Sequence, residues 1–245
     1  MDAKRAIMTA AVFAGVLAVI FSGMQVAQAG EAARKSKVLY TDEFFTEDCT
    51  FASTGANQFF ILEPGYQQTF VGEEDGEEVE LVITVFDETK QVDGIETRVV
   101  EERESVDGEL VEVSRNYFAI CEQTNSVFYF GEDVDDYEDG EIVSHDGAWL
   151  AGQDGARAGI MMPGTVLLGS RYMQEIAPEI AMDRAHIISM NGTVETPAGT
   201  FENVLKIRET TPLEPSAREF KYYAAGIGLI QDANLKLEEY GPTEE

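Results

Sequence analysis

The sequence predicts an all-β protein with one large, curved antiparallel sheet of the meander type, similar to a half-barrel. Two observations lead to this fold class. Asp-Gly occurs six times, and both residues tolerate the positive φ angles of a two-residue hairpin turn. The segments between these turns alternate apolar and polar residues, as in EEVELVITVFDE (77–88), which is the period of a half-buried strand.

The strands expected from this pattern run along most of the chain. Six or seven of them lie between about residues 66 and 150. In the second half, Asn191-Gly192 and Pro197-Ala198-Gly199 are expected turns. No segment after residue 30 repeats apolar residues at helical spacing over three turns. The strands expected there are 165–176, 185–190, 204–209, 220–223 and 228–232.

The first 29 residues have the pattern of a cleaved signal peptide. Lys4 and Arg5 precede an uncharged apolar run over 6–22, and Ala27-Gln28-Ala29 fits a signal-peptidase site. A retained anchor helix is the alternative, but the run is near the lower limit for a membrane span. We therefore expect a periplasmic or secreted bacterial protein with no stable membrane span after cleavage.

Three further segments follow the expected cleavage site. Residues 30–58 are polar and poorly patterned, and we expect an N-terminal arm lying over the sheet. Residues 59–241 are expected to form a single all-β domain, with a disordered C-terminus at 242–245.

The charge balance excludes some classes of partner. The chain carries 46 acidic and 17 basic residues, for a net charge of −29, and the acids are spread along it. Such a surface repels phosphate backbones and anionic headgroups, which disfavours binding to nucleic acids or membranes. Solvation in a saline habitat or attraction of cations would explain the acidity. Because salt screens self-repulsion, we expect stability to rise with ionic strength.

Two cysteines, Cys49 and Cys121, would lie in an oxidising compartment after export. They can form a disulfide that ties the arm to the sheet, or remain two buried thiols. The pair lacks the C-x-x-C spacing of redox and zinc motifs.

The acidic stretch DDYEDGEIVSHDGAW (135–149) allows two interpretations. Aligned on Gly140 it resembles an EF-hand loop, but Tyr137 stands at the third position and the flanks are strand-like. Hairpin turns explain it better. A looser calcium site with oxygen ligands stays open as an alternative, using Asp133, Asp135, Asp136 and Asp139.

The sequence contains few recognisable catalytic motifs. Only His145 and His186 are available for histidine chemistry, and no P-loop, G-x-S-x-G or dinucleotide fingerprint occurs. A hydrolase with paired carboxylates stays a remote alternative, because acids are too abundant for one pair to stand out.

The most unusual loop is GQDGARAGIMMPG (152–164), where three glycines precede an apolar tip next to the only tryptophan. It is either a lid over a pocket or a crossover that packs its tip into the core. The lid interpretation assigns Trp149, Met161 and Met162 to the gate of a ligand site.

Three segments carry a resemblance: FFILEPGYQQTFVGEEDGEEV (59–79), TPAGTFENVLKIRETTPLEP (196–215) and EFKYYAAGIGLIQD (219–232). They resemble a widespread group of uncharacterised bacterial exported proteins. The pattern PAGTF-x-N followed by Y-Y-A-x-G-x-G is also similar to LolA-type half-barrel lipoprotein carriers. That similarity implies a curved sheet whose concave face holds acyl chains, although a fold does not fix a function.

These observations favour a non-enzymatic exported protein with a binding or structural role. The expected ligand is an apolar small molecule on the concave face of the sheet, and an envelope protein is another expected partner. A calcium-responsive envelope protein is the alternative. Apart from calcium, no cofactor is expected.

Overall fold

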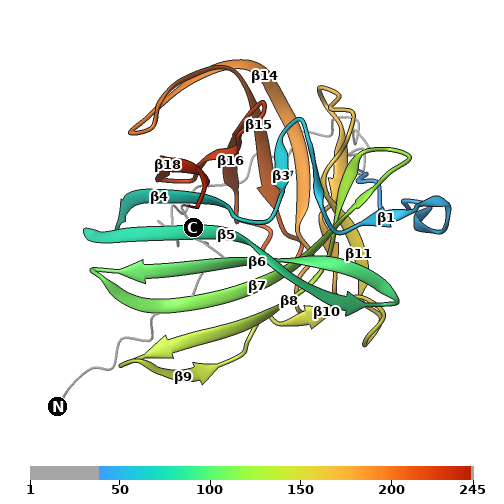
Figure 1. The fold of residues 1–245 in the computed structure, drawn as a ribbon, viewed down its shortest axis with the longest axis horizontal. Helices are drawn as coiled ribbons and strands as arrows, with labels where there is room; N and C mark the ends of the chain where they lie inside the picture. The colour runs from blue at the N-terminus through green and yellow to red at the C-terminus, as the bar shows by residue number, and fades with distance from the viewer. Residues whose placement is uncertain (1–38, 244–245) are drawn as a thin grey trace, which may run out of the picture.

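The computed structural model describes residues 39–243, and the expected signal peptide lies outside them. These residues form one sixteen-stranded antiparallel sheet and a separate two-stranded hairpin, which confirms the all-β prediction (Figure 1). None of the described helices is long and apolar enough to cross a membrane.

The first half of the described chain contains η1 and ten strands. They are η1 (Thr46–Asp48), β1 (Phe51–Ala52), β2 (Gly55–Asn57), β3 (Phe60–Leu62), β4 (Tyr66–Glu74), β5 (Glu77–Val92), β6 (Ile95–Val106), β7 (Glu109–Cys121), β8 (Ser126–Glu138), β9 (Glu141–Ser144) and β10 (Trp149–Leu150). The second half contains β11 (Arg157–Met162), β12 (Arg171–Met173), β13 (Glu175–Ile176), β14 (Arg184–Thr196), β15 (Gly199–Thr210), β16 (Glu219–Ala224), β17 (Gly228–Asp232) and β18 (Leu235–Pro242).

The sheet curves until its two ends almost meet. Its main order is β12-β14-β15-β16-β17-β18-β4-β5-β6-β7-β8-β11-β13. The two end strands are consecutive in the chain, since only Gln174 separates β12 from β13. One short segment thus pairs with β14 through its first residues and with β11 through its last, which nearly closes the half-barrel.

The Asp-Gly turns lie where the sequence predicts them. Asp75, Asp93, Asp107 and Asp139 all have positive φ, and each precedes a glycine that also has positive φ. They connect β4 to β5, β5 to β6, β6 to β7 and β8 to β9. The stretch 135–149 therefore forms hairpin strands and not an EF-hand.

Several element boundaries differ from the prediction. Residues 157–162 of the expected loop are strand β11, so its irregular parts are only 152–156 and 163–164. The predicted turn at Asn191-Gly192 is wrong, because β14 continues through it with shifts in register. The C-terminal segment also pairs further than expected, since Gly241 and Pro242 lie opposite Gln67 and Tyr66.

Two apolar clusters stabilise the sheet. The larger contains Phe118, Phe128, Met162 and Ile187, with Phe51 of the arm packed against it. The smaller lies around Phe70 and Leu237, which are fully buried. The members of the smaller cluster come mainly from β4, β5, β17 and β18, so it holds the two halves of the meander together.

The inner face is less apolar than the concave-face hypothesis requires. Leu81, Glu104, Glu112 and Asp136 are successive partners across β5 to β8, so three carboxylates share the face of Leu81. Glu102 shares that face, and its pKa is raised mainly by burial. Charged groups on β15, β16 and β17 also shift it. The curved sheet therefore encloses a partly polar interior.

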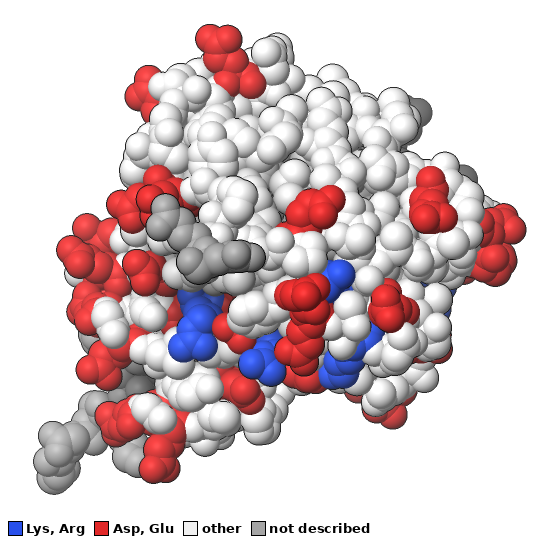
Figure 2. All heavy atoms as spheres, viewed as in Figure 1, with Lys and Arg blue, Asp and Glu red and all other residues white. Residues whose placement is uncertain are grey.

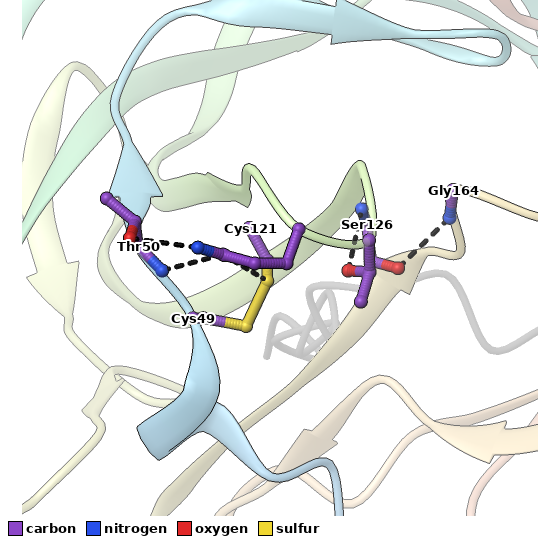
Figure 3. The surroundings of a disulfide bond; sticks show 7 residues. Cys49, Thr50, Cys121, Ser126 and Gly164 are labelled. Carbon is purple, nitrogen blue, oxygen red and sulfur yellow. Dashed lines mark hydrogen bonds between the residues drawn. A yellow bond between two sulfur atoms is a disulfide. The ribbon is translucent and has the colours of Figure 1, made fainter.

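The N-terminal arm is fastened to the sheet by a disulfide between Cys49 and Cys121, with 5.2 Å between the Cα atoms (Figure 3). Next to it, β1 pairs with β7, where Phe51 lies opposite Cys121. The side chain of Gln123 accepts a hydrogen bond from Thr50 N at 2.8 Å and donates one to Thr50 Oγ1 at 2.9 Å. Of the two alternatives for these cysteines, the structure shows the disulfide.

Acidic side chains are spread over the surface. On the face in Figure 2 they lie both around the rim and in the middle, and the basic side chains lie among them in the lower half. The acidity of the chain therefore does not form a single patch on this face.

Candidate binding cavity beside Trp149

A cavity of about 220 Å³ lies beside β10, between the end of that strand and two loops. It is smaller than the usual range for drug-sized ligands, roughly 300–1,000 Å³, and fits a small molecule. It is lined by Glu132, Asp133, Ala148, Trp149, Leu150, Gln153, Asp154, Ala156, Ala177, Pro178 and Ile180.

A close approach of two strands positions Trp149. In β10, Trp149 lies opposite Glu132 and Leu150 lies opposite Gly131 of β8. A Cβ atom on Gly131 would collide with the Trp149 carbonyl oxygen, and φ at this glycine is +136°. Only glycine meets both conditions without displacing β10.

The indole ring is held by aromatic contacts. Trp149 is only 5% exposed. Its ring meets Tyr129 edge to face at 5.2 Å between centroids, and Tyr129 stacks on Phe118 at 4.8 Å. Such pairs fix ring orientation in addition to burying area. Within residues 39–243 the indole N–H has no acceptor in hydrogen-bond geometry.

Two tight turns complete the walls. In the loop after β10, Gly152 N donates to Ala156 O at 2.9 Å, and Asp154 takes a positive φ at its tip. After β13, Ala177 N donates to Ala181 O at 2.7 Å. This second turn leaves Ile180 47% exposed at the cavity.

The lining is amphipathic. Seven lining residues are apolar, and Glu132, Asp133 and Asp154 contribute carboxylates. Burial raises the pKa of Glu132 to about 7, while the nearby Tyr129 hydroxyl favours its charged form and limits the rise. The Glu132 charge therefore changes near neutral pH.

The Asp133 carboxylate is already paired with other side chains of the protein. It accepts a hydrogen bond from Lys90 Nζ at 2.7 Å and another from the Tyr117 hydroxyl. Burial acts to raise the pKa of Asp133, but these hydrogen bonds and the Lys90 charge lower it overall. Glu132 and Asp154 are thus the lining carboxylates left to meet a ligand.

The structure places only one of the three proposed gate residues at this cavity. Trp149 lines it, whereas Met161 and Met162 belong to β11 and do not. Met162 is fully buried in the larger apolar cluster. Met161 packs against that cluster, with its sulfur 3.6 Å from Gln174 Nε2. Gly152 and Gly155 precede strand β11 and Gly159 lies within it, which agrees with the crossover interpretation and not with a lid.

The four aspartates proposed for calcium are not gathered at one point. Asp133 and Asp135 share one face of β8, Asp136 lies on the opposite face, and Asp139 is in the turn. Asp133 is bound to Lys90, and Asp135 Oδ1 lies 2.8 Å from His145 Nδ1. Among the described residues, no three His, Cys, Asp or Glu side chains are arranged to hold a metal ion.

Sequence reasoning missed most of the lining. Glu132 and Asp154 are two acids among 46 and carry no distinguishing pattern. Ile180 comes from a turn that joins the site only because β13 pairs with β11 at Arg157 and Ala158. Trp149 can be predicted from the sequence, because it is the only tryptophan and stands before a glycine-rich loop.

Comparison with protein-family models, curated proteins and solved structures finds no match to this chain.

Proposed function

We propose that this chain is an exported, non-enzymatic binding protein that holds a small amphipathic amine in the cavity beside Trp149. The observation that carries the proposal is the division of the lining into an apolar wall and two carboxylates free of ion pairs with described residues. An aliphatic or aromatic body would pack on Trp149 and Ile180. Its ammonium group would face Glu132 and Asp154, and an aromatic ring also favours a nearby cation.

The charge of the whole protein supports a cationic ligand. A net charge of −29 raises the local concentration of cations and lowers that of anions. It also argues against the anionic lipids that a LolA-like carrier would accept. The proposed ligand therefore differs from the expected apolar small molecule on the concave face, because it carries a positive charge.

Export is part of the proposal and rests on the pattern of residues 1–29 and on the disulfide. Disulfides are stable in the periplasm or outside the cell and are rare in the cytosol of mesophiles. The resemblance to exported bacterial proteins is in keeping with this location.

The emission of Trp149 tests the function directly, because the chain has no other tryptophan. Hexylammonium, hexanoate and hexanol share one alkyl length and differ only in the head group. We expect a saturable change in emission with hexylammonium, a weaker one with hexanol and none with hexanoate.

Two variants show whether the carboxylate matters. Glu132→Gln is expected to weaken hexylammonium binding roughly tenfold, the effect of losing one charge-assisted contact. The exposed Glu238→Gln removes the same charge from β18 and is expected to change nothing. An equal response to all three head groups would refute the amine, and no response at all would refute the site.

A further inference from the structure

A second cavity, of about 380 Å³, has the opposite chemistry. It is lined by Tyr40, Arg171, Arg184, Arg208, Thr210 and Arg218. Four arginines in one cavity are unexpected in a chain with 46 acidic residues and 17 basic ones. Like charges repel, so the fold must hold them together at some cost.

These four arginines are also the ones without ion pairs. Residues 39–243 contain eight arginines. The other four, Arg98, Arg103, Arg115 and Arg157, each have a carboxylate partner. In the same part of the chain none of the four cavity arginines has one. With acids so abundant, their absence at this one place leaves a local excess of positive charge.

Strand register explains how the cluster forms. Arg171 of β12 lies opposite His186 of β14, and His186 lies opposite Arg208 of β15. One step along the same face, Arg184 lies opposite Thr210. Arg218 enters from the loop before β16. Rigid neighbouring strands thus carry three of the guanidinium groups.

The N-terminal arm supplies the remaining wall. Thr41 N donates to Arg171 O, and Met173 N donates to Thr41 O, both at 2.9 Å. These bonds fix Tyr40 against the sheet, where the Arg184 guanidinium lies 4.7 Å from the centre of its ring. Tyr40 therefore orients Arg184 without neutralising it.

Few donors in the cavity are used by the protein. Arg184 Nε donates to Thr210 Oγ1 at 3.0 Å, and Arg208 Nη2 donates to His186 Nδ1 at 2.9 Å. The Nε atoms of Arg171 and Arg208 are buried and have no partner among the described residues. Burial, and then the charges of Arg171 and Arg208, lower the pKa of His186, which keeps its ring neutral and able to accept this bond. Buried donors without acceptors are costly, and an anionic group in the cavity would stabilise the guanidinium groups that carry them.

We propose that this cavity binds a small organic polyanion with two or more carboxylate or phosphate groups. Guanidinium forks match both groups in pairs of parallel hydrogen bonds. A volume of about 380 Å³ falls within the usual range for ligand pockets, and four arginines exceed the need of one monovalent anion. The site is independent of the cavity beside Trp149, which has other lining residues.

Calorimetric titration of the exported chain at constant ionic strength and pH 7.5 tests the site. Citrate supplies carboxylates and fructose 1,6-bisphosphate supplies phosphates, while acetate and fructose are the monovalent and neutral controls. We expect one site per chain for citrate, for the bisphosphate or for both, and the stronger of the two identifies the preferred group. Acetate and fructose should not bind.

Matched variants separate the site from general electrostatics. Arg218 is exposed and makes no hydrogen bond or ion pair with the described residues, so Arg218→Gln should fold normally, as a melting curve will verify. It is expected to weaken polyanion binding about tenfold. Arg157→Gln removes an equal charge at an arginine paired with Glu43 and is expected to change the affinity less than twofold.

Three results would overturn the proposal. They are no binding of either polyanion at millimolar concentration, binding of acetate as strong as that of citrate, and equal effects of the two arginine variants. Failure of the amine to bind at Trp149 would leave this result unaffected, because the two titrations use different ligands and different residues.

Discussion

Glu104 of β6 lies directly opposite Glu112 of β7, so two carboxylates stand side by side on the inner face of the sheet. Like charges in this position destabilise a sheet if both are ionised. Burial, followed by the charges of neighbouring acids, raises the pKa of Glu104 to about 7 and that of Glu112 to about 8. Near neutral pH the folded protein therefore holds protons that the unfolded chain releases.

Stability is expected to fall as the pH rises. The contribution from these two groups is complete below about pH 4.5, their ordinary pKa, and is lost as the pH passes through 7 to 8. The urea midpoint measured from pH 5 to 9 at fixed ionic strength should decrease most steeply between about pH 5.5 and 7, where only the folded protein holds these protons, and should level off above about pH 8. Glu112→Gln should flatten the decrease, and a midpoint that rises over this range would contradict the account.

Gly131→Ala is expected to destabilise the fold and to disturb Trp149. The added methyl group would collide with the Trp149 carbonyl oxygen, and the positive φ adds strain, for a loss of about 2–4 kcal/mol. Gly140→Ala is the matched control, since φ is +78° there and nothing lies within 4 Å of the new atom. It should cost roughly 1 kcal/mol. Chemical unfolding measures both variants, and equal losses would argue against the close approach.

Reduction of the Cys49–Cys121 disulfide should lower the melting temperature. The bond closes a loop with a sequence separation of 72 residues. Its loss raises the conformational entropy of the unfolded chain, which lowers the free energy of unfolding by roughly 4 kcal/mol. For a domain of this size that corresponds to about 10 °C. Melting with and without dithiothreitol measures the shift. The Cys49→Ser/Cys121→Ser variant should melt low in both conditions, and a wild-type curve insensitive to reductant would contradict the prediction.

Amine binding beside Trp149 should strengthen as the pH rises from 6 to 8. Glu132 loses its proton near pH 7, whereas an alkylammonium keeps its charge over this interval. The ionised carboxylate attracts the ammonium, so affinity grows with deprotonation. Trp149 titrations with hexylammonium at several pH values measure this dependence, which Glu132→Gln should abolish. An affinity that falls over the interval would assign the contact to another group.

The hairpins could be predicted because their signal is local. Asp-Gly fixes a turn through the backbone preferences of two adjacent residues, and the alternation on either side fixes the strands. Asn191-Gly192 shows the limit of this reasoning. Those residues allow a turn, but β14 pairs with β15 on both sides of them, so the strand continues with shifts in register. Tertiary pairing overrides local preference there.

The cavities could not be predicted because they depend on register. Arg171, Arg184, Arg208 and Arg218 are separated by 13, 24 and 10 positions in the sequence, a spacing without periodicity. They meet only because β12, β14 and β15 align, and no local pattern specifies that alignment. Similarly, Ile180 reaches Trp149 through the closure of the sheet by β13.

The most direct test of the proposed binding function is a crystal structure of the protein grown with hexylammonium. We predict that the alkyl chain lies against Trp149 and Ile180, with the ammonium nitrogen within hydrogen-bond distance of Glu132 or Asp154. Hexylammonium bound only elsewhere, with the cavity beside Trp149 holding water alone, would contradict the account.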